Sequence, residues 1–199
     1  MLKKLQKIFK IKKIFFLIFL IFNISNISFA DNTERNNQLD KLFVQLKNTK
    51  NLSSAQIVEN KIWKIWSIHP SNDRRGYRLT ELLDQGSLLI DRRELNKAYE
   101  IFSQIILVDP NWAEAWNKRA LVLYLMNRYQ SSLGDINKTL ILEPRHFGAL
   151  SGQALNYIEL KQYEKAIKSY KAAQKIYPIN GAAKKMIPQL QELINDQAV

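Results

Sequence analysis

The chain has 199 residues, and 30 lysines and arginines against 18 aspartates and glutamates give it a formal net charge of +12 at pH 7. It contains no cysteine, which excludes disulfides, thiolate metal sites and a lipid-modified N-terminal cysteine. Its two histidines fall in separate predicted loops, and no histidines or acidic residues have the spacing of metal ligands. With only six glycines and no phosphate-binding loop, the sequence predicts a protein that is not an enzyme and uses no cofactor or metal.

Residues 1–30 have the three-part organisation of a secretory signal peptide. Six lysines and no acid precede the apolar run Ile14–Phe22, and the segment ends Ser28-Phe29-Ala30, with small residues three and one before the predicted cleavage. The apolar run has nine residues, fewer than the roughly 20 of a membrane-spanning helix. We therefore expect cleavage after Ala30 and export to the periplasm. An uncleaved signal that anchors the chain in the inner membrane is the alternative.

The remaining charge does not favour a nucleic-acid partner. Residues 1–30 hold six of the 30 basic residues and none of the acids, so the rest of the chain has a net charge of about +6. No run of five or more basic residues follows residue 30, and a nucleic-acid-binding surface usually needs such a patch. Contact with a membrane is expected only if the signal is uncleaved.

Residues 31–78 are predicted to hold a helical hairpin ahead of the repeats. The segment 31–36 is polar and predicted to be disordered. In 37–70, two stretches with apolar residues at helical spacing predict two helices, the second ending at Pro70. Residues 71–78 are rich in turn formers and charge, which predicts a linker. We expect the hairpin to cap the N-terminal end of the repeats.

A 34-residue period follows, marked by Pro110, Pro144 and Pro178. Each unit has two stretches with apolar residues three and four apart, separated by a short polar break, and the proline ends the second stretch. A fixed period of this length predicts helical hairpins stacked in series, because one hairpin cannot bury its apolar face alone. The three units are 79–112, 113–146 and 147–180.

The units resemble tetratricopeptide (TPR) repeats over residues 79–178. The family's bulky, small and helix-crossing positions recur in register in each unit. They are filled by Leu82, Gly86 and Ala98, by Trp116, Ala120 and Ser132, and by Leu150, Ala154 and Ala166. The resemblance implies an all-α fold, a right-handed superhelical solenoid of antiparallel helical hairpins. Segments 115–129 and 142–152 also look like those of small exported bacterial TPR proteins.

Beside the small position, where the family usually has leucine, this chain has Gln85, Arg119 and Gln153. Three polar residues in register predict either a hydrogen-bonded ladder or a polar lip, and partial exposure is the simpler interpretation. After the last unit, residues 181–199 predict a capping helix with a polar outer face. Pro188 is expected to kink this helix or to restart it.

By resemblance, the first helix of each unit lines a concave groove that binds a protein or peptide. The residues on this face are spaced i, i+4, i+7 and are mainly apolar, which favours an apolar or amphipathic segment as partner. Only Asn117 and Lys185 suit the family's gripping of acidic C-terminal tails, so that mode is disfavoured. The predicted groove residues are Leu83, Ser87, Ile90, Asn117, Leu121, Tyr124, Ser151, Leu155, Ile158 and Lys185.

The rim of the groove is predicted to carry Trp112, Arg145 and His146, which follow two of the periodic prolines. An exposed Trp112 would be a binding hot spot, whereas a buried one would pack against the start of the second unit. Arg145 and His146 would give the rim a local positive charge.

The sequence as a whole predicts a non-enzymatic protein–protein interaction adaptor in the bacterial periplasm. The alternative is a signal-anchored structural factor at the membrane surface, whose groove is filled by its own N-terminal hairpin. Trp63 and Trp66 would then pack on Leu121 and Tyr124, because large exposed apolar patches are rare on soluble monomers.

Overall fold

The structure, a computed structural model, describes residues 33–197, and within them it contains helices and no strand. The predicted signal peptide lies outside these residues. The chain divides into two compact units, Met1–Gln38 and Leu39–Val199. In the first unit residues 33–38 are helical, so the prediction of disorder for 31–36 is wrong for residues 33–36. The Gln38 amide donates a hydrogen bond of 3.2 Å to Glu34, and pairs four residues apart stabilise a helical turn.

The second unit begins with the predicted hairpin. Residues 39–48 are helical, and α2 (Leu52–Ser67) starts after Asn51, whose side chain accepts a hydrogen bond from the backbone N–H of Ser54. The apolar residues of both helices form one buried cluster, because their helical spacing places them on facing sides. Its members from the hairpin are Leu39, Phe43, Leu46, Ala55, Val58, Ile62 and Trp66.

The connection to the repeats is shorter than predicted. Helix α3 (Arg74–Asp91) begins where the Asp73 side chain accepts a 2.7 Å hydrogen bond from the backbone N–H of Gly76. This N-cap satisfies one of the free donors of the first turn, so the helix starts inside the segment 71–78 that was predicted to be a linker. That prediction is therefore wrong for residues 74–78.

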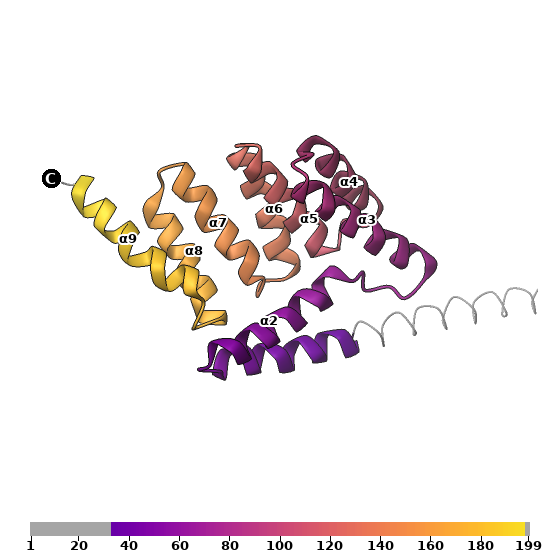
Figure 1. The fold of residues 1–199 in the computed structure, drawn as a ribbon, viewed down its shortest axis with the longest axis horizontal. Helices are drawn as coiled ribbons and strands as arrows, with labels where there is room; N and C mark the ends of the chain where they lie inside the picture. Colours follow the sequence, from indigo (N-terminus) through magenta and orange to yellow (C-terminus); the bar gives the residue numbers. More distant parts are fainter. Residues whose placement is uncertain (1–32, 198–199) are drawn as a thin grey trace, which may run out of the picture. The chain divides into compact units, whose positions relative to one another are not determined.

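The repeats form successive antiparallel hairpins, which confirms an all-α solenoid (Figure 1). Each second helix ends two residues before a periodic proline, as expected if proline and its predecessor disfavour helical geometry. Helix α9 continues through Pro188 without a restart. The remaining helices are α4 (Leu95–Val108), α5 (Ala113–Leu125), α6 (Tyr129–Leu142), α7 (Phe147–Glu159), α8 (Tyr163–Ile176) and α9 (Gly181–Gln197).

The same tight turn joins the two helices of each of the three repeats. Arg93, Asn127 and Lys161 have φ angles of 61°, 58° and 55°, in the left-handed region. In each case the backbone N–H groups of this residue and the next bond to carbonyls of the preceding helix, which satisfies acceptors at its end. The turn therefore recurs every 34 residues without the glycine that usually fills it.

The polar residue beside the small position forms inter-helix hydrogen bonds in the second unit. Arg119 on α5 pairs with both carboxylate oxygens of Asp135 on α6, at 2.7 and 2.9 Å. Its third donor reaches Ser103 on α4 at 3.1 Å. Arg119 therefore connects its own hairpin with the hairpin before it.

Gln153 makes the equivalent connections in the third unit. It accepts a 2.8 Å hydrogen bond from the Ser169 hydroxyl on α8 and donates a 3.5 Å bond to Asn137 on α6. The partners lie 16 residues before and after, as they do for Arg119. Gln85, in the first unit, is exposed. The polar positions thus form a hydrogen-bonded ladder in two units, and in these units Arg119 and Gln153 are also partly exposed, as the simpler interpretation of the sequence expected.

Helix α2 lies along the edge of the array where α5 and α7 begin (Figure 1). The Trp66 ring stacks on His146, with ring centroids 4.0 Å apart and planes 9° apart. The Trp66 carbonyl accepts a 3.0 Å hydrogen bond from the Trp112 indole N–H. Phe147 and Tyr177 join the same apolar cluster, so the hairpin is packed against all three units.

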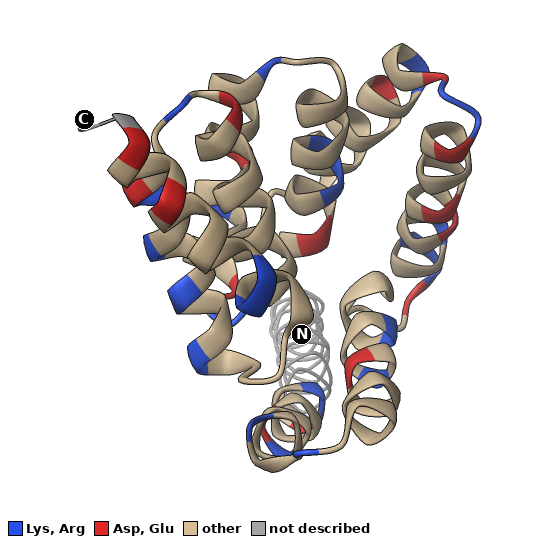
Figure 2. Ribbon diagram, turned by 60° about the vertical axis from the view of Figure 1, so that its left-hand side comes forward, with Lys and Arg blue, Asp and Glu red and all other residues tan. Residues whose placement is uncertain are grey.

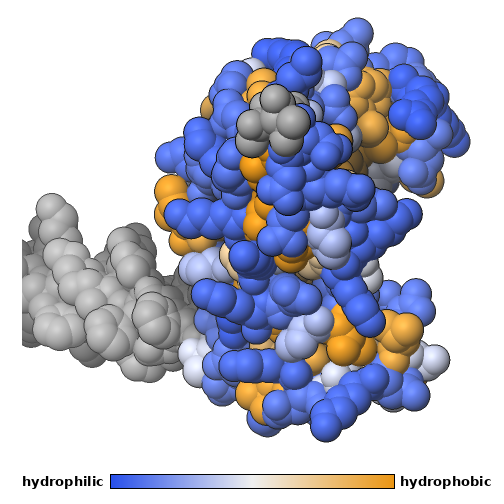
Figure 3. Space-filling model, turned by 90° about the vertical axis from the view of Figure 1, so that its left-hand side faces the viewer, coloured by the Kyte–Doolittle hydropathy of each residue, from blue (hydrophilic) through white to orange (hydrophobic). Residues whose placement is uncertain are grey.

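Basic and acidic residues are interspersed over most of the helices (Figure 2). Helix α8 differs, because it carries four lysines and one glutamate. The surface at the α9 end is mostly hydrophilic, with hydrophobic side chains in separate small groups (Figure 3). Among residues 33–197, no helix combines the length and hydrophobicity needed to cross a membrane.

Candidate functional site

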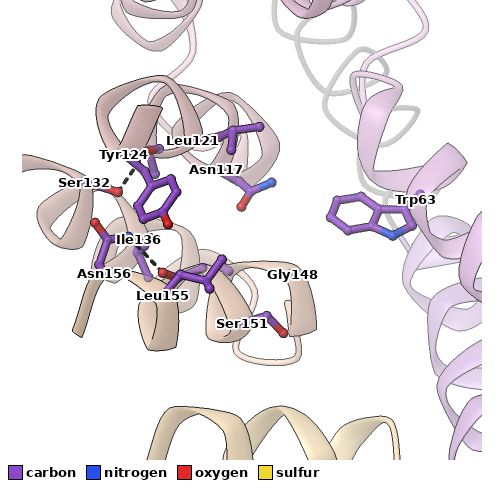
Figure 4. A pocket seen from close by; sticks show the side chains of 13 residues that line it. Trp63, Asn117, Leu121, Tyr124, Ser132, Ile136, Gly148, Ser151, Leu155 and Asn156 are labelled. Carbon is purple, nitrogen blue, oxygen red and sulfur yellow. Dashed lines mark hydrogen bonds between the residues drawn. The ribbon is translucent and has the colours of Figure 1, made fainter. Parts of the chain in front are cut away.

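A pocket of about 280 Å³ lies between α2 on one side and α5, α6 and α7 on the other (Figure 4). Most of its lining is apolar, and none of the lining residues carries a charge. The residues that line it are Trp63, Asn117, Ala120, Leu121, Tyr124, Ser132, Ile136, Gly148, Ala149, Ser151, Gly152, Leu155 and Asn156.

Five of the predicted groove residues meet in this pocket. Asn117, Leu121 and Tyr124 share one face of α5, because residues three and four apart lie on the same side of a helix. Ser151 and Leu155 do the same on α7. Leu121 and Leu155 are 42% and 39% exposed, so both present apolar surface that residues 33–197 leave uncovered.

The inner part of the pocket is built from small residues. Ala120 and Gly152 leave room there, and the Ser132 hydroxyl is occupied by a 2.8 Å hydrogen bond to the Ala120 carbonyl. The Asn156 amide donates to the Gly152 carbonyl at 2.8 Å, while its buried oxygen has no hydrogen-bond partner among the described residues. That oxygen points away from Trp63 in Figure 4.

Trp63 forms the wall opposite α5 and α7. Its indole N–H donates to Glu59 at 3.3 Å, and the Tyr177 hydroxyl donates to the other oxygen of that carboxylate at 3.1 Å. Burial, and then the Glu59 carboxylate, raise the pKa of Tyr177 to about 12. The polar edge of the indole is therefore turned away from the pocket, which faces carbon atoms of the ring (Figure 4).

The contact between Trp63 and α7 depends on a glycine. A Cβ atom at Gly148 would lie 2.5 Å from Trp63 Cη2, closer than such atoms approach in proteins. Because residue 148 is a glycine, the indole can pack directly against the α7 backbone. The hairpin therefore fills a part of the predicted groove, and the rest of the groove stays open. Trp66 is buried against Phe43, His146 and Phe147 rather than against Leu121 and Tyr124.

The other five predicted groove residues do not line the pocket. Leu83 is buried in the core between α3, α4 and α5, and Ser87 donates a hydrogen bond to its carbonyl. Ile90 and Ile158 are half-buried against core clusters. Lys185 is exposed on α9.

Two of the three predicted rim residues are buried. Trp112 is 3% exposed, so it packs at the start of the second unit rather than offering a free hot spot. His146 is fully buried, and its Nδ1 accepts a 3.0 Å hydrogen bond from the backbone N–H of Ala149 at the start of α7. Arg145 is half-buried and bound by Glu143 and Asp40, and the Glu143 carboxylate raises its pKa. The prediction of a positively charged rim is therefore wrong.

One edge of the pocket has ionisable groups with shifted pKa values. Burial, and then the nearby Glu159 carboxylate, raise the pKa values of Tyr124 and Tyr129. Both hydroxyls donate to that carboxylate, at 3.5 and 3.3 Å. Both phenols are therefore held protonated, and the Tyr124 ring forms part of the wall.

Sequence reasoning missed the small lining residues. Gly148 and Gly152 lie four apart on one face of α7, and Ser151 lies beside them, a spacing that indicates close approach of another element. The element that approaches α7 is the N-terminal hairpin. Its position could not be predicted, because the hairpin lies outside the 34-residue period of the sequence. Ser132, at the helix-crossing position of the second unit, and Ile136 lie on α6, and both are buried.

Within residues 33–197, no three His, Asp or Glu side chains are grouped so that they could hold a metal ion. Helical hairpins stacked in series around an uncharged pocket define an α-helical repeat protein of the solenoid class.

Comparison with known proteins agrees with this class. Residues 147–180 match the family model described as tetratricopeptide repeat. A TPR repeat-containing protein of Rhizobium etli is 31% identical over 155 residues, which cover 78% of this chain and 74% of the relative. The chain belongs to the tetratricopeptide repeat family.

More distant similarities agree with the fold. The Drosophila melanogaster homologue of the BBSome complex member BBS4 is 26% identical over 122 residues, covering 61% of this chain and 24% of that protein. The first TPR domain of Spaghetti (RPAP3), solved with the HSP90 peptide SRMEEVD, superposes with a TM-score of 0.57 at 17% identity, covering 59% of this chain and 93% of the domain. The crystal structure of MamA superposes with a TM-score of 0.57 at 21% identity, covering 72% of this chain and 78% of the MamA chain.

Proposed function

We propose that this protein is a non-enzymatic adaptor that binds a segment of a partner protein in the pocket between α2, α5 and α7. The observation that carries the proposal is the pair of half-exposed leucines, Leu121 on α5 and Leu155 on α7, which both line an uncharged pocket. Apolar side chains left open beside a concave pocket mark binding sites, because burial of each by a partner is favourable.

The TPR structures that superpose on this chain support a peptide as the kind of partner. RPAP3 domains were solved with HSP90 and HSP70 peptides that end in acidic residues, and the TPR2B domain of yeast Sti1 was solved as a complex with pHsp70. Recognition of a carboxylate needs cationic donors. Because this pocket is lined by no lysine or arginine, we propose an apolar or amphipathic segment as the partner here.

We further propose that the adaptor works in the periplasm. The support is the sequence of residues 1–30, with its lysines, its nine-residue apolar run and its Ser-Phe-Ala end. N-terminal sequencing of the protein made in cells tests this. A start at Asp31 is expected, and a retained Met1 would support the membrane-anchored alternative instead.

Pull-down from a periplasmic extract tests the binding surface. The wild-type protein is compared with the triple variant Asn117→Ala, Leu121→Ala and Tyr124→Ala. The matched control is Ser131→Ala, Lys138→Ala and Ile141→Ala, three exposed positions of α6 outside the pocket. We expect partners that are retained by the wild type and the control and lost by the pocket variant, with thermal melting showing that all three are folded. Identical partners for all three proteins would exclude the pocket as the binding surface.

A further inference from the structure

The wall formed by Trp63 is fixed in place before any partner binds. The ring meets Trp66 and Phe147 edge to face, with centroids 5.3 and 5.6 Å apart. Its N–H is held by Glu59, and its far edge rests on Gly148. Because the Trp63 side chain is held on three sides, it has little rotamer freedom to lose. The entropy cost of ordering it is therefore small when a partner packs on it.

The opposite side of the pocket presents a hydrogen-bond acceptor that no side chain of the described residues occupies. Asn117 donates its amide N–H to Glu114 Oε2 at 3.2 Å, and this buried carboxylate fixes which end of the amide is the donor. The Asn117 oxygen is left turned toward the space above Gly148 and Ser151 (Figure 4). The open pocket therefore offers apolar walls together with an acceptor, which suits a ligand that donates a hydrogen bond and lacks a charge.

The volume limits the size of that ligand. An apolar cavity of about 150 Å³ accepts one benzene molecule. The pocket here, at about 280 Å³, has room for a larger ring system than a single six-membered ring. Aromatic rings also pack favourably edge to face, the arrangement that Trp63 already makes with its neighbours.

We infer that the pocket takes the side chain of a tryptophan from the partner, with its ring beside Trp63 and its N–H donated to Asn117. Indole combines the required size, apolar faces and single uncharged donor. Phenylalanine has no donor, leucine has neither donor nor ring, and an acidic side chain has no cation to meet in the pocket. This inference rests on the proposed function and specifies the chemistry of the partner's anchor.

The test titrates the full-length protein with N-acetyl-tryptophanamide, N-acetyl-phenylalaninamide and N-acetyl-leucinamide. Binding is followed by the NMR shifts of the Leu121, Leu155 and Ile136 methyl groups. A ligand of this size should bind with a dissociation constant of about 1 mM. The tryptophan probe should bind at least about fivefold more tightly than the phenylalanine probe, because only it satisfies the acceptor. Equal affinity for all three probes, or no shift of these methyl groups, would overturn the inference.

Two variants separate the role of each wall. In Asn117→Leu the preference for tryptophan over phenylalanine should fall to about one, while the phenylalanine affinity is kept; a structural defect would weaken both. Gly148→Ala should weaken the tryptophan probe about fivefold or more by displacing Trp63, whereas Gly134→Ala, which meets no atom within 4 Å, should leave it unchanged. An unchanged preference in Asn117→Leu, or unchanged binding in Gly148→Ala, would contradict the inference.

The outcome is separable from that of the proposed function. If pull-down partners depend on the α5 face while the probes show no preference for tryptophan, the adaptor function holds and the tryptophan anchor is wrong. If neither the binding of the probes nor the binding of any partner depends on the pocket residues, both the adaptor function and the tryptophan anchor are wrong.

Discussion

His146 donates a 2.9 Å hydrogen bond from Nε2 to Glu114, and both side chains are fully buried. The proton lies on Nε2 because Nδ1 accepts the backbone N–H of Ala149. The pair joins the first turns of α5 and α7, and the imidazole is also the surface on which Trp66 of the hairpin stacks. The side chain of His146, predicted to lie on an exposed rim, thus contacts three helices: α2, α5 and α7.

Replacing His146 should therefore be costly. In His146→Ala the Glu114 carboxylate stays buried without its main donor, and we expect a loss of about 3–5 kcal/mol in the free energy of unfolding, measured by urea denaturation. Glu114→Gln, which keeps an acceptor for the histidine, should lose less. A loss below about 1 kcal/mol in His146→Ala would mean that water reaches the carboxylate.

Two glycines should respond oppositely to the same substitution. A Cβ at Gly86 would lie 2.6 Å from the fully buried Phe102 ring, so Gly86→Ala should destabilise the fold by about 1–3 kcal/mol. A Cβ at Gly134, in the middle of α6, meets nothing within 4 Å. Gly134→Ala should stabilise by about 0.5–1 kcal/mol through helix propensity. Thermal melting of both variants checks the pair, and equal shifts would contradict the packing at Gly86.

The ion pair between Arg119 and Asp135 should show measurable coupling. Its two hydrogen bonds lie where the side chains are 17% and 9% exposed, so solvent screens them little, and the Asp135 carboxylate raises the pKa of Arg119. A double-mutant cycle with Arg119→Leu and Asp135→Ala should give a coupling energy of about 1–3 kcal/mol. Ser103→Ala serves as a control for the weaker third bond. Additive effects in the cycle would show that the pair contributes nothing beyond packing.

Acid should weaken a second histidine–carboxylate contact. The hydrogen bond from His69 to Asp109, 2.8 Å long, lowers the pKa of Asp109 below its ordinary value. A lowered carboxyl pKa contributes stability above the unfolded-state value of about 3.9 and loses it as pH falls through the folded value. The stability difference between wild type and Asp109→Asn should therefore be constant above about pH 5 and shrink below pH 4. Urea denaturation as a function of pH measures it, and a difference that persists at pH 2 would contradict the assignment.

The periodic part of the molecule could be predicted from sequence, because a 34-residue period and helical spacing act locally. The ends of the units, the small positions and the face shared by Asn117, Leu121 and Tyr124 all follow from residues a few positions apart. The burial of His146, and the choice between a buried and an exposed Trp112, could not be predicted, because both residues are covered by a hairpin more than 40 residues earlier in the chain. The pocket could not be predicted for the same reason, because one of its walls is Trp63 of the N-terminal hairpin.

The path of α2 also bears on how the molecule unfolds. In an ordinary array each repeat touches only its neighbours, so an end can fray while the rest persists. Here a single helix contacts the starts of α5 and α7 through Trp66, and reaches the end of α8 through Glu59 and Tyr177. Unfolding of one repeat therefore removes contacts that hold α2 in place, and α2 in turn contacts the other repeats. The three repeats and the hairpin should melt together in one transition, and a small repeat protein built in this way exposes few partly open forms to proteases.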